Sequence, residues 1–249
     1  MWQFSQVIDG MTKACEELEV PITGGNVSFY NETLGEGIYP TSVMGIVGIL
    51  EDVHKTAKMH FAEAGRKIVL LRANEPGDAV DAESEFGSSE YAKEILGAVW
   101  GYPPELDLEK EATLQRGLVA LIQQGLVESV HDCADGGLAV ALAECAFPKG
   151  IGLSVNLANR GLPAEFVLFS EDASRVVVSC DPGKLARIQE LAGEYELFAD
   201  VLGETGGEGV EIRLAGQAVI CAAVRELSDA YEGALEKALR TELTAVAAD

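Results

Sequence analysis

Residues 21–33 read Pro21-Ile22-Thr23-Gly24-Gly25-Asn26-Val27-Ser28-Phe29-Tyr30-Asn31-Glu32-Thr33 and follow an expected helix. Glycine tolerates positive φ angles, so the backbone N–H groups of this segment can converge into a concave anion site. Asn26 offers a carbonyl oxygen to a hard cation, and Ser28 offers a hydroxyl group to a substrate oxygen. A hairpin turn at Gly25-Asn26 is the structural alternative, and the local sequence alone favours that turn.

A second motif reads His131-Asp132-Cys133-Ala134-Asp135-Gly136-Gly137-Leu138-Ala139-Val140-Ala141-Leu142-Ala143-Glu144 and runs into an expected helix. Asp135, followed by two glycines, can supply a capping carboxylate and accessible backbone N–H groups. We favour the structural alternative, a helix N-cap that packs tightly against a strand. At the turn of residues 171–175, a local ion pair between Glu171 and Arg175 is likewise favoured over a phosphate site.

The two motifs resemble the synthetase subunit of phosphoribosylformylglycinamidine synthase, the PurL family. The first motif continues as IYPTSVMGIVG over residues 38–48, and weaker matches occur at residues 87–91 and 169–175. The resemblance covers most of the chain but only the C-terminal portion of the small-type family sequence. The first half of that sequence is absent here, so we expect Met1 to be internal to a longer protein.

The resemblance implies an α+β fold with two domains. Residues 1–56 are expected to form a truncated PurM N-terminal-like domain, and residues 57–249 a PurM C-terminal-like α/β domain. Hydrophobic periodicity predicts an amphipathic helix over residues 3–18, and β-branched runs predict buried strands over residues 39–50 and 68–71. The truncated domain should expose apolar surface and strand edges, which favours association into homo-oligomers.

Further elements are expected along the chain, most of them in the second domain. Short strands are expected at residues 20–22, 127–131, 152–157, 176–178 and 198–202, helices at 90–99, 106–126, 138–147, 183–191 and 227–239, an acidic turn at 203–209, and a closing hairpin at 210–222.

By resemblance, Gly25 contacts ATP, Asn26 contributes to a magnesium site, and Ser28 contacts formylglycinamide ribonucleotide (FGAR). The implied reaction converts FGAR, ATP and ammonia from glutamine into the amidine product FGAM, ADP and phosphate in purine biosynthesis. The family's catalytic histidines, its acidic magnesium ligands and an ATP-contacting aspartate belong to the part absent here. No catalytic residue is therefore assigned, and we expect the chain alone to be inactive.

The composition excludes some classes of binding partner. The chain has 249 residues and a formal net charge of −23, which argues against nucleic acid or an anionic membrane surface as a partner. No P-loop, dinucleotide-binding glycine motif or nucleophile elbow is present, and no segment has the length of a membrane-spanning helix. The resemblance implies four partners: the missing N-terminal half, a glutaminase subunit, a small assembly subunit and the small-molecule substrate.

Cysteine usage indicates a reducing compartment. The cysteines are odd in number and form no C-x-x-C pair: Cys15, Cys133, Cys145, Cys180 and Cys221. This pattern is typical of reduced thiols, so we expect a cytoplasmic protein without a signal peptide. A catalytic pair of His131 and Cys133 is disfavoured, because an isolated buried cysteine usually packs in a core.

Two other functions stay open. The chain can be a non-catalytic scaffold or nucleotide-binding module of the same fold. It can also belong to another ATP-dependent enzyme of the PurM superfamily, such as aminoimidazole ribonucleotide synthetase or selenophosphate synthetase. The continuation NVSFYNET, residues 26–33, favours the PurL family over these relatives.

Overall fold

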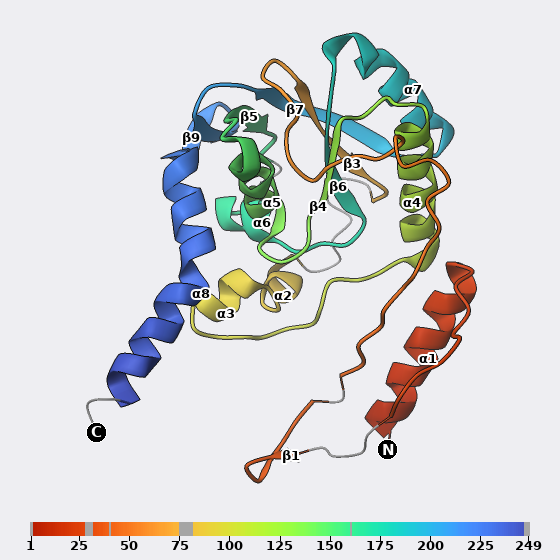
Figure 1. The fold of residues 1–249 in the computed structure, drawn as a ribbon, viewed down its shortest axis with the longest axis vertical. Helices are drawn as coiled ribbons and strands as arrows, with labels where there is room; N and C mark the ends of the chain where they lie inside the picture. The colour runs from red at the N-terminus through yellow and green to blue at the C-terminus, as the bar shows by residue number, and fades with distance from the viewer. Residues whose placement is uncertain (1, 28–31, 40, 75–81, 160, 247–249) are drawn as a thin grey trace. The chain divides into compact units, whose positions relative to one another are not determined.

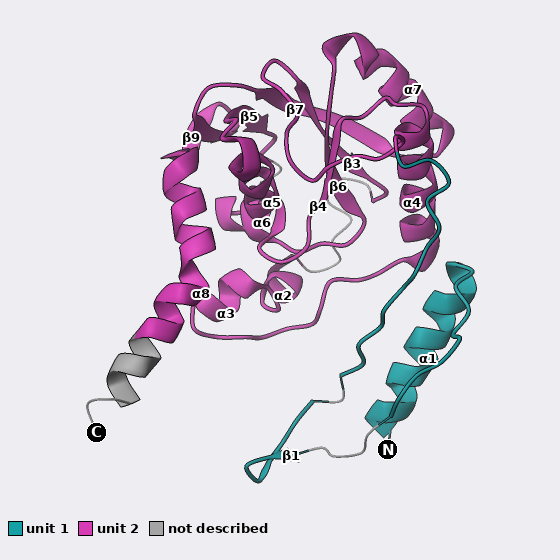
Figure 2. Ribbon diagram, in the orientation of Figure 1, with its two compact units in different colours: residues 1–53 teal, residues 54–249 magenta. Residues whose placement is uncertain are grey.

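The structure is a computed structural model that describes residues 2–27, 32–39, 41–74, 82–159 and 161–246, with the backbone alone beyond residue 240. The chain forms two compact units, Met1–Val53 and His54–Asp249 (Figure 2). Each unit is described by itself below. The boundary at residues 56 and 57 that the resemblance implies stays a prediction.

The described residues of the first unit form one helix and one small hairpin. Helix α1 spans Trp2–Glu17, and its half-buried side chains recur at helical spacing, as the sequence predicts. Strands β1 (Glu32–Thr33) and β2 (Glu36–Gly37) pair around Leu34 and Gly35, which have φ angles of 54° and 85°. Two consecutive positive φ angles are typical of the tight turn that closes a two-residue hairpin.

The expected strands over residues 20–22 and 39–50 are wrong within the described residues. Residues 20–27 and 41–50 are irregular, and the side chains of 41–50 are exposed. Val43, Val47 and Ile49 expose 94%, 97% and 95% of their surface. A strand needs a neighbour for its backbone groups, and no other strand of the described part of this unit pairs with this segment. The expected exposure of apolar surface is confirmed, whereas the expected strand edges are limited to the small hairpin.

The second unit contains a seven-stranded sheet with the order β4-β6-β3-β7-β5-β8-β9. Its strands are β3 (Lys67–Arg72), β4 (Ser129–Asp132), β5 (Leu153–Leu157), β6 (Arg175–Cys180), β7 (Phe198–Thr205), β8 (Gly209–Leu214) and β9 (Gln217–Ala223). Neighbouring strands are antiparallel except β5 and β8, which are parallel. Strand β7 extends into the acidic turn expected at residues 203–209, so that turn is shorter than predicted.

Helices cover both faces of this sheet (Figure 1). The helices are α2 (Ala82–Phe86), α3 (Glu90–Glu94), α4 (Leu108–Gln123), α5 (Gly137–Ala146), α6 (Ala164–Phe169), α7 (Leu185–Glu194) and α8 (Val224–Val246), with 3-10 turns η1 (Phe147–Lys149) and η2 (Pro182–Lys184). Among the described helices, none combines the length and the apolar character required to cross a bilayer.

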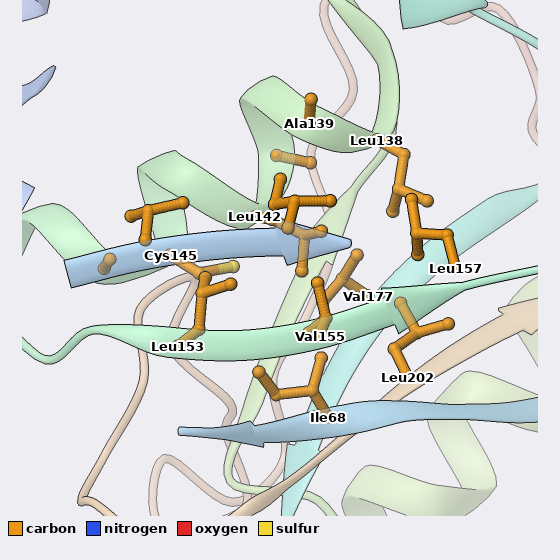
Figure 3. Close-up of a cluster of buried hydrophobic side chains, with 14 of the residues drawn as sticks. Ile68, Leu138, Ala139, Leu142, Cys145, Leu153, Val155, Leu157, Val177 and Leu202 are labelled. Atoms are coloured by element: carbon orange, nitrogen blue, oxygen red, sulfur yellow. The ribbon is translucent and has the colours of Figure 1, made fainter. Parts of the chain in front are cut away.

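The interior strand β3 explains why the core has two halves. Ile68 and Leu70 point into the cluster beneath α5 and α6, whereas Val69 and Leu71 point into the cluster beneath α4 and α7. Figure 3 shows the first cluster, in which Leu142 of α5 lies over Val155 and Ile68 of the sheet. A strand buried on both faces requires a continuous apolar run, and this is what the sequence has at residues 68–71.

Candidate functional site

Residues 21–27, which include Gly24 and Gly25, are exposed and belong to no strand. Gly24, Gly25 and Asn26 lie in irregular backbone, and no atom lies within 4 Å of a Cβ built on either glycine. The turn expected from the local sequence at Gly25-Asn26 is wrong, because the hairpin of this unit lies at Leu34-Gly35. Ser28 lies outside the described residues. The backbone of residues 21–27 is therefore not used in strand pairing.

In the second unit, three segments that match the PurL family meet at one carboxylate. Glu171 Oε1 accepts hydrogen bonds from the backbone N–H of Gly136 at 2.8 Å and of Glu90 at 2.9 Å. Gly136 belongs to the motif of residues 131–144, Glu90 to residues 87–91, and Glu171 to residues 169–175. The sequence identified these segments one by one, and the structure brings them together.

The cap expected of Asp135 is wrong. Gly136 is the N-cap residue of α5, with a φ angle of 78° and no side-chain cap, and Asp135 is exposed. Gly137 has a φ angle of 68°, and a Cβ built there would lie 2.4 Å from the carbonyl oxygen of Ser170. The tight packing expected of this turn is confirmed, and it requires glycine because both the φ angle and the close approach exclude a side chain.

The expected ion pair between Glu171 and Arg175 is also wrong among the described contacts. Arg175 donates to the carbonyl oxygens of Ser170 at 2.7 Å and Asp172 at 3.2 Å, and its Nη1 lies 3.4 Å from Asp172 Oδ2. The guanidinium group therefore stabilises its own turn. Because its donors face protein oxygens, this turn does not present the free cation that a phosphate site requires.

The surroundings of His131 and Cys133 also disfavour a catalytic pair. Burial raises the pKa of the Cys133 thiol to about 11, so the thiol is protonated at neutral pH. His131 Nδ1 lies 2.7 Å from the carbonyl oxygen of Asp132, and Nε2 lies 3.3 Å from Glu144 Oε2. Neither ring nitrogen is directed at the thiol, and among the described residues no group of three or more His, Cys, Asp or Glu could hold a metal ion.

A cavity of about 540 Å³ lies beside the Glu171 junction, and sequence reasoning did not find it. Its apolar lining includes Leu70, Leu138, Leu157, Phe166 and Leu202. The charged residues that line it within the described part of the chain are Arg72, Lys110, Arg175, Glu85, Glu105, Asp107, Asp172 and Asp200. Among the described lining residues, five carboxylates against three cations disfavour a phosphorylated ligand. Because the lining residues come from many separate segments, no local sequence pattern indicates the cavity.

The fold defines the second unit as an α+β domain in which helices cover both faces of a mixed sheet. The chain belongs to the AIR synthase-related protein family: the family's C-terminal domain matches residues 63–215, and its N-terminal domain matches residues 1–50.

Several curated relatives carry the name phosphoribosylformylglycinamidine synthase subunit PurL, which confirms the resemblance. The relative from Moorella thermoacetica is 42% identical over 226 residues, which cover 91% of this chain. The relative from Anaeromyxobacter is 40% identical over 260 residues and covers all of this chain. The chain spans only 30% and 32% of the length of these two relatives.

Solved structures of T. maritima PurL have the same fold. PurL complexed with FGAR matches 71% of this chain and 30% of its own chain, with a TM-score of 0.61 and 24% identity. PurL complexed with ATP matches 71% of this chain and 28% of its own chain, with a TM-score of 0.57 and 21% identity. These likenesses confirm the expected α+β, PurM-like fold.

Proposed function

We propose that this chain is part of an ATP-dependent FGAR amidotransferase of de novo purine biosynthesis. The observation that carries this proposal is the 42% identity to a PurL subunit over 91% of the chain. FGAR and ATP are the ligands in the T. maritima PurL structures of the same fold. In the proposed reaction, the amide oxygen of FGAR is phosphorylated, ammonia displaces the phosphate, and FGAM, ADP and phosphate are released.

Within this proposal, Gly25 contacts ATP, Asn26 contributes one oxygen ligand to Mg²⁺, and Ser28 contacts FGAR. Support comes from the exposed backbone at Gly25 and from the exposed amide of Asn26. Mg²⁺ prefers oxygen ligands and keeps water and nucleotide oxygens in its shell, so a single neutral amide fits as one member of the ligand set. The ion would neutralise charge on the phosphates, while this chain's residues orient the reactants.

We further propose that residues 1–56 form one wall of a site that other parts of a longer protein complete. The large apolar exposure in the first unit supports this, because such surfaces are normally covered by a partner. The missing N-terminal half is the proposed cover. A glutaminase subunit that supplies ammonia and a small assembly subunit are the further partners, and the cytoplasm is the proposed compartment.

Magnesium-dependent ATP binding by this chain tests the assignment of Asn26. We expect calorimetry to detect ATP binding that requires Mg²⁺ and that weakens about tenfold or more in Asn26→Ala, since an inner ligand is lost. Asn159→Ala, which removes an exposed amide in the second unit, is the matched control and should bind as the unchanged chain does. Equal binding by both variants would remove Asn26 from the metal site.

FGAR separates the proposed function from its alternatives. Magnesium ATP binding that tightens when FGAR is added favours the amidotransferase over other PurM-type enzymes. Stable folding without any affinity for ATP or FGAR favours the scaffold. We expect no FGAM formation by this chain alone with ATP, FGAR and ammonium, so robust turnover would overturn the proposal that another part completes the site.

A further inference from the structure

The Glu171 junction joins backbone segments that are far apart in the chain. Its hydrogen bonds bridge sequence separations of 81 residues to Glu90 and 35 residues to Gly136. Both donors approach the same atom, Oε1, and both belong to positions where a helix begins. The first N–H groups of a helix lack partners within the helix, so each needs an acceptor from elsewhere.

A carboxylate suits these two donors better than a neutral acceptor. Hydrogen bonds to an ionised oxygen are stronger than neutral ones, and the converging N–H dipoles attract negative charge. Arg175 does not take the Glu171 carboxylate as its partner, because it contacts Ser170 and Asp172 instead. The Ser89 side chain caps α3 by accepting from Ala92 N–H, which leaves the N–H of Glu90 to Glu171. Glu171 therefore supplies the anion at this junction.

Aromatic packing joins two of these three segments through the helices α2, α3 and α6. The ring of Phe86 stacks on Phe166 with centroids 4.3 Å apart, and Tyr91 stacks on Phe169 at 4.8 Å. These contacts attach α2 and α3 to α6, directly before Glu171. The glycine turn closes onto the same place, because Gly137 approaches the carbonyl oxygen of Ser170.

We propose that Glu171 is a positioning residue that acts as an internal anion, occupying with its carboxylate the backbone donors that a ligand's phosphate or carboxylate would otherwise take. The glycine turn of residues 135–137 is therefore closed to anions in this chain and is held at a fixed distance from α3. Removal of the carboxylate opens a site for a small anion. This inference depends on contacts within the second unit alone and stands whether or not the proposed reaction is correct.

Chemical rescue by formate tests the proposal. We expect Glu171→Ala to lower the melting temperature, and we expect formate to raise it again in a saturable way by replacing the missing carboxylate. The unchanged chain and Glu165→Ala, which removes an exposed carboxylate of α6, should show only the small common effect of the salt. A formate response in Glu171→Ala no larger than in these controls would overturn the internal-anion role.

Amide hydrogen exchange supplies a second readout at the two donors. In Glu171→Ala, exchange at Gly136 and Glu90 should become about tenfold faster or more, and formate should slow it again. Glu171→Gln keeps an acceptor oxygen without the charge, so its exchange should be intermediate and should not respond to formate. If the alanine variant does not fold, the glutamine variant decides: unchanged exchange at both amides would contradict the proposal.

Discussion

Arg72 Nε donates to Asp200 Oδ2 at 2.9 Å, and the same guanidinium lies 4.5 Å from the ring centroid of Phe198. The arginine ends β3, and both partners stand on the neighbouring strand β7. Only 7% of the Arg72 side chain is exposed, whereas 40% of the Asp200 side chain is exposed. The pair therefore holds a buried cation in the lining of the cavity, where β3 ends and β7 begins.

Loss of the Asp200 carboxylate should destabilise the second unit. Asp200→Ala leaves a buried guanidinium without one of its partners. We therefore expect the free energy of unfolding, measured in urea, to fall by about 1–2 kcal/mol. Arg213→Ala disrupts an exposed pair with Glu211 and should change stability by less than about 0.5 kcal/mol. Equal effects of the two substitutions would show that burial of Arg72 does not decide the outcome.

Gly203 should tolerate no side chain. It pairs within the sheet, and a Cβ there would lie 2.0 Å from the carbonyl oxygen of Ser154. Gly203→Ala must separate β5 from β7, so we expect a loss of about 3 kcal/mol or more in a denaturant titration. Gly193 lies in α7 with nothing within 4 Å of its Cβ, so Gly193→Ala should be neutral or stabilising by up to about 1 kcal/mol. A mild effect at Gly203 would contradict the close strand approach.

The sequence correctly predicts the elements whose buried side chains follow a regular hydrophobic pattern along the chain. Residues 68–71 and the alternating residues 153–157 are strands, and residues 108–123 form the long helix expected there. The strand expected at residues 39–50 fails because β-branched residues favour a strand only where a neighbouring strand accepts its backbone hydrogen bonds. The turn is expected to begin at Gly203, which is instead part of strand β7. The glycine is needed there because β5 approaches β7 closely at this position.

At the candidate site, too, the local sequence does not reveal which side chains meet. Asp135 is the local cap candidate beside the helix start, yet the acceptor at Gly136 is Glu171, 35 residues further along the chain. Local spacing cannot reveal this, because Glu171 reaches the turn only after β5 and α6 have been placed. The arrangement of the cavity depends on tertiary structure for the same reason.

Thiol labelling should separate the cysteines by burial. Cys221 is exposed, whereas Cys133, Cys145 and Cys180 expose 6%, 1% and 0% of their surface. We expect Ellman's reagent at pH 8 to label Cys221 rapidly, the half-buried Cys15 more slowly, and these three only after unfolding, with Cys221→Ser removing the rapid phase. Rapid labelling of Cys133 in that variant would contradict the packed core.

Alkaline pH should weaken the folded state through Cys133. Because burial raises the pKa of this thiol to about 11, the folded protein binds the proton more tightly than the unfolded chain. The resulting stabilisation is fully present below the pKa of the unfolded thiol, near 9, and is lost as the pH rises towards 11. Cys133→Ala should therefore show a shallower loss of stability over this interval than the unchanged chain. Parallel pH profiles of the two proteins would contradict this role of the thiol.

Deletion of residues 1–53 should leave the second unit folded. Every residue of both buried clusters lies within His54–Asp249, so the cooperative core does not depend on the first unit. We expect the shortened chain to unfold in one transition, within about 5 °C of the melting temperature of the full chain.

The shortened chain should bind less of a hydrophobic dye and associate less in light scattering, because the exposed side chains of Val43, Val47 and Ile49 are gone. Val47→Glu in the full chain is the matched variant and should reduce association in part. If deletion abolishes the transition, the first unit belongs to the folding core; if association persists unchanged, the contact surface lies in the second unit.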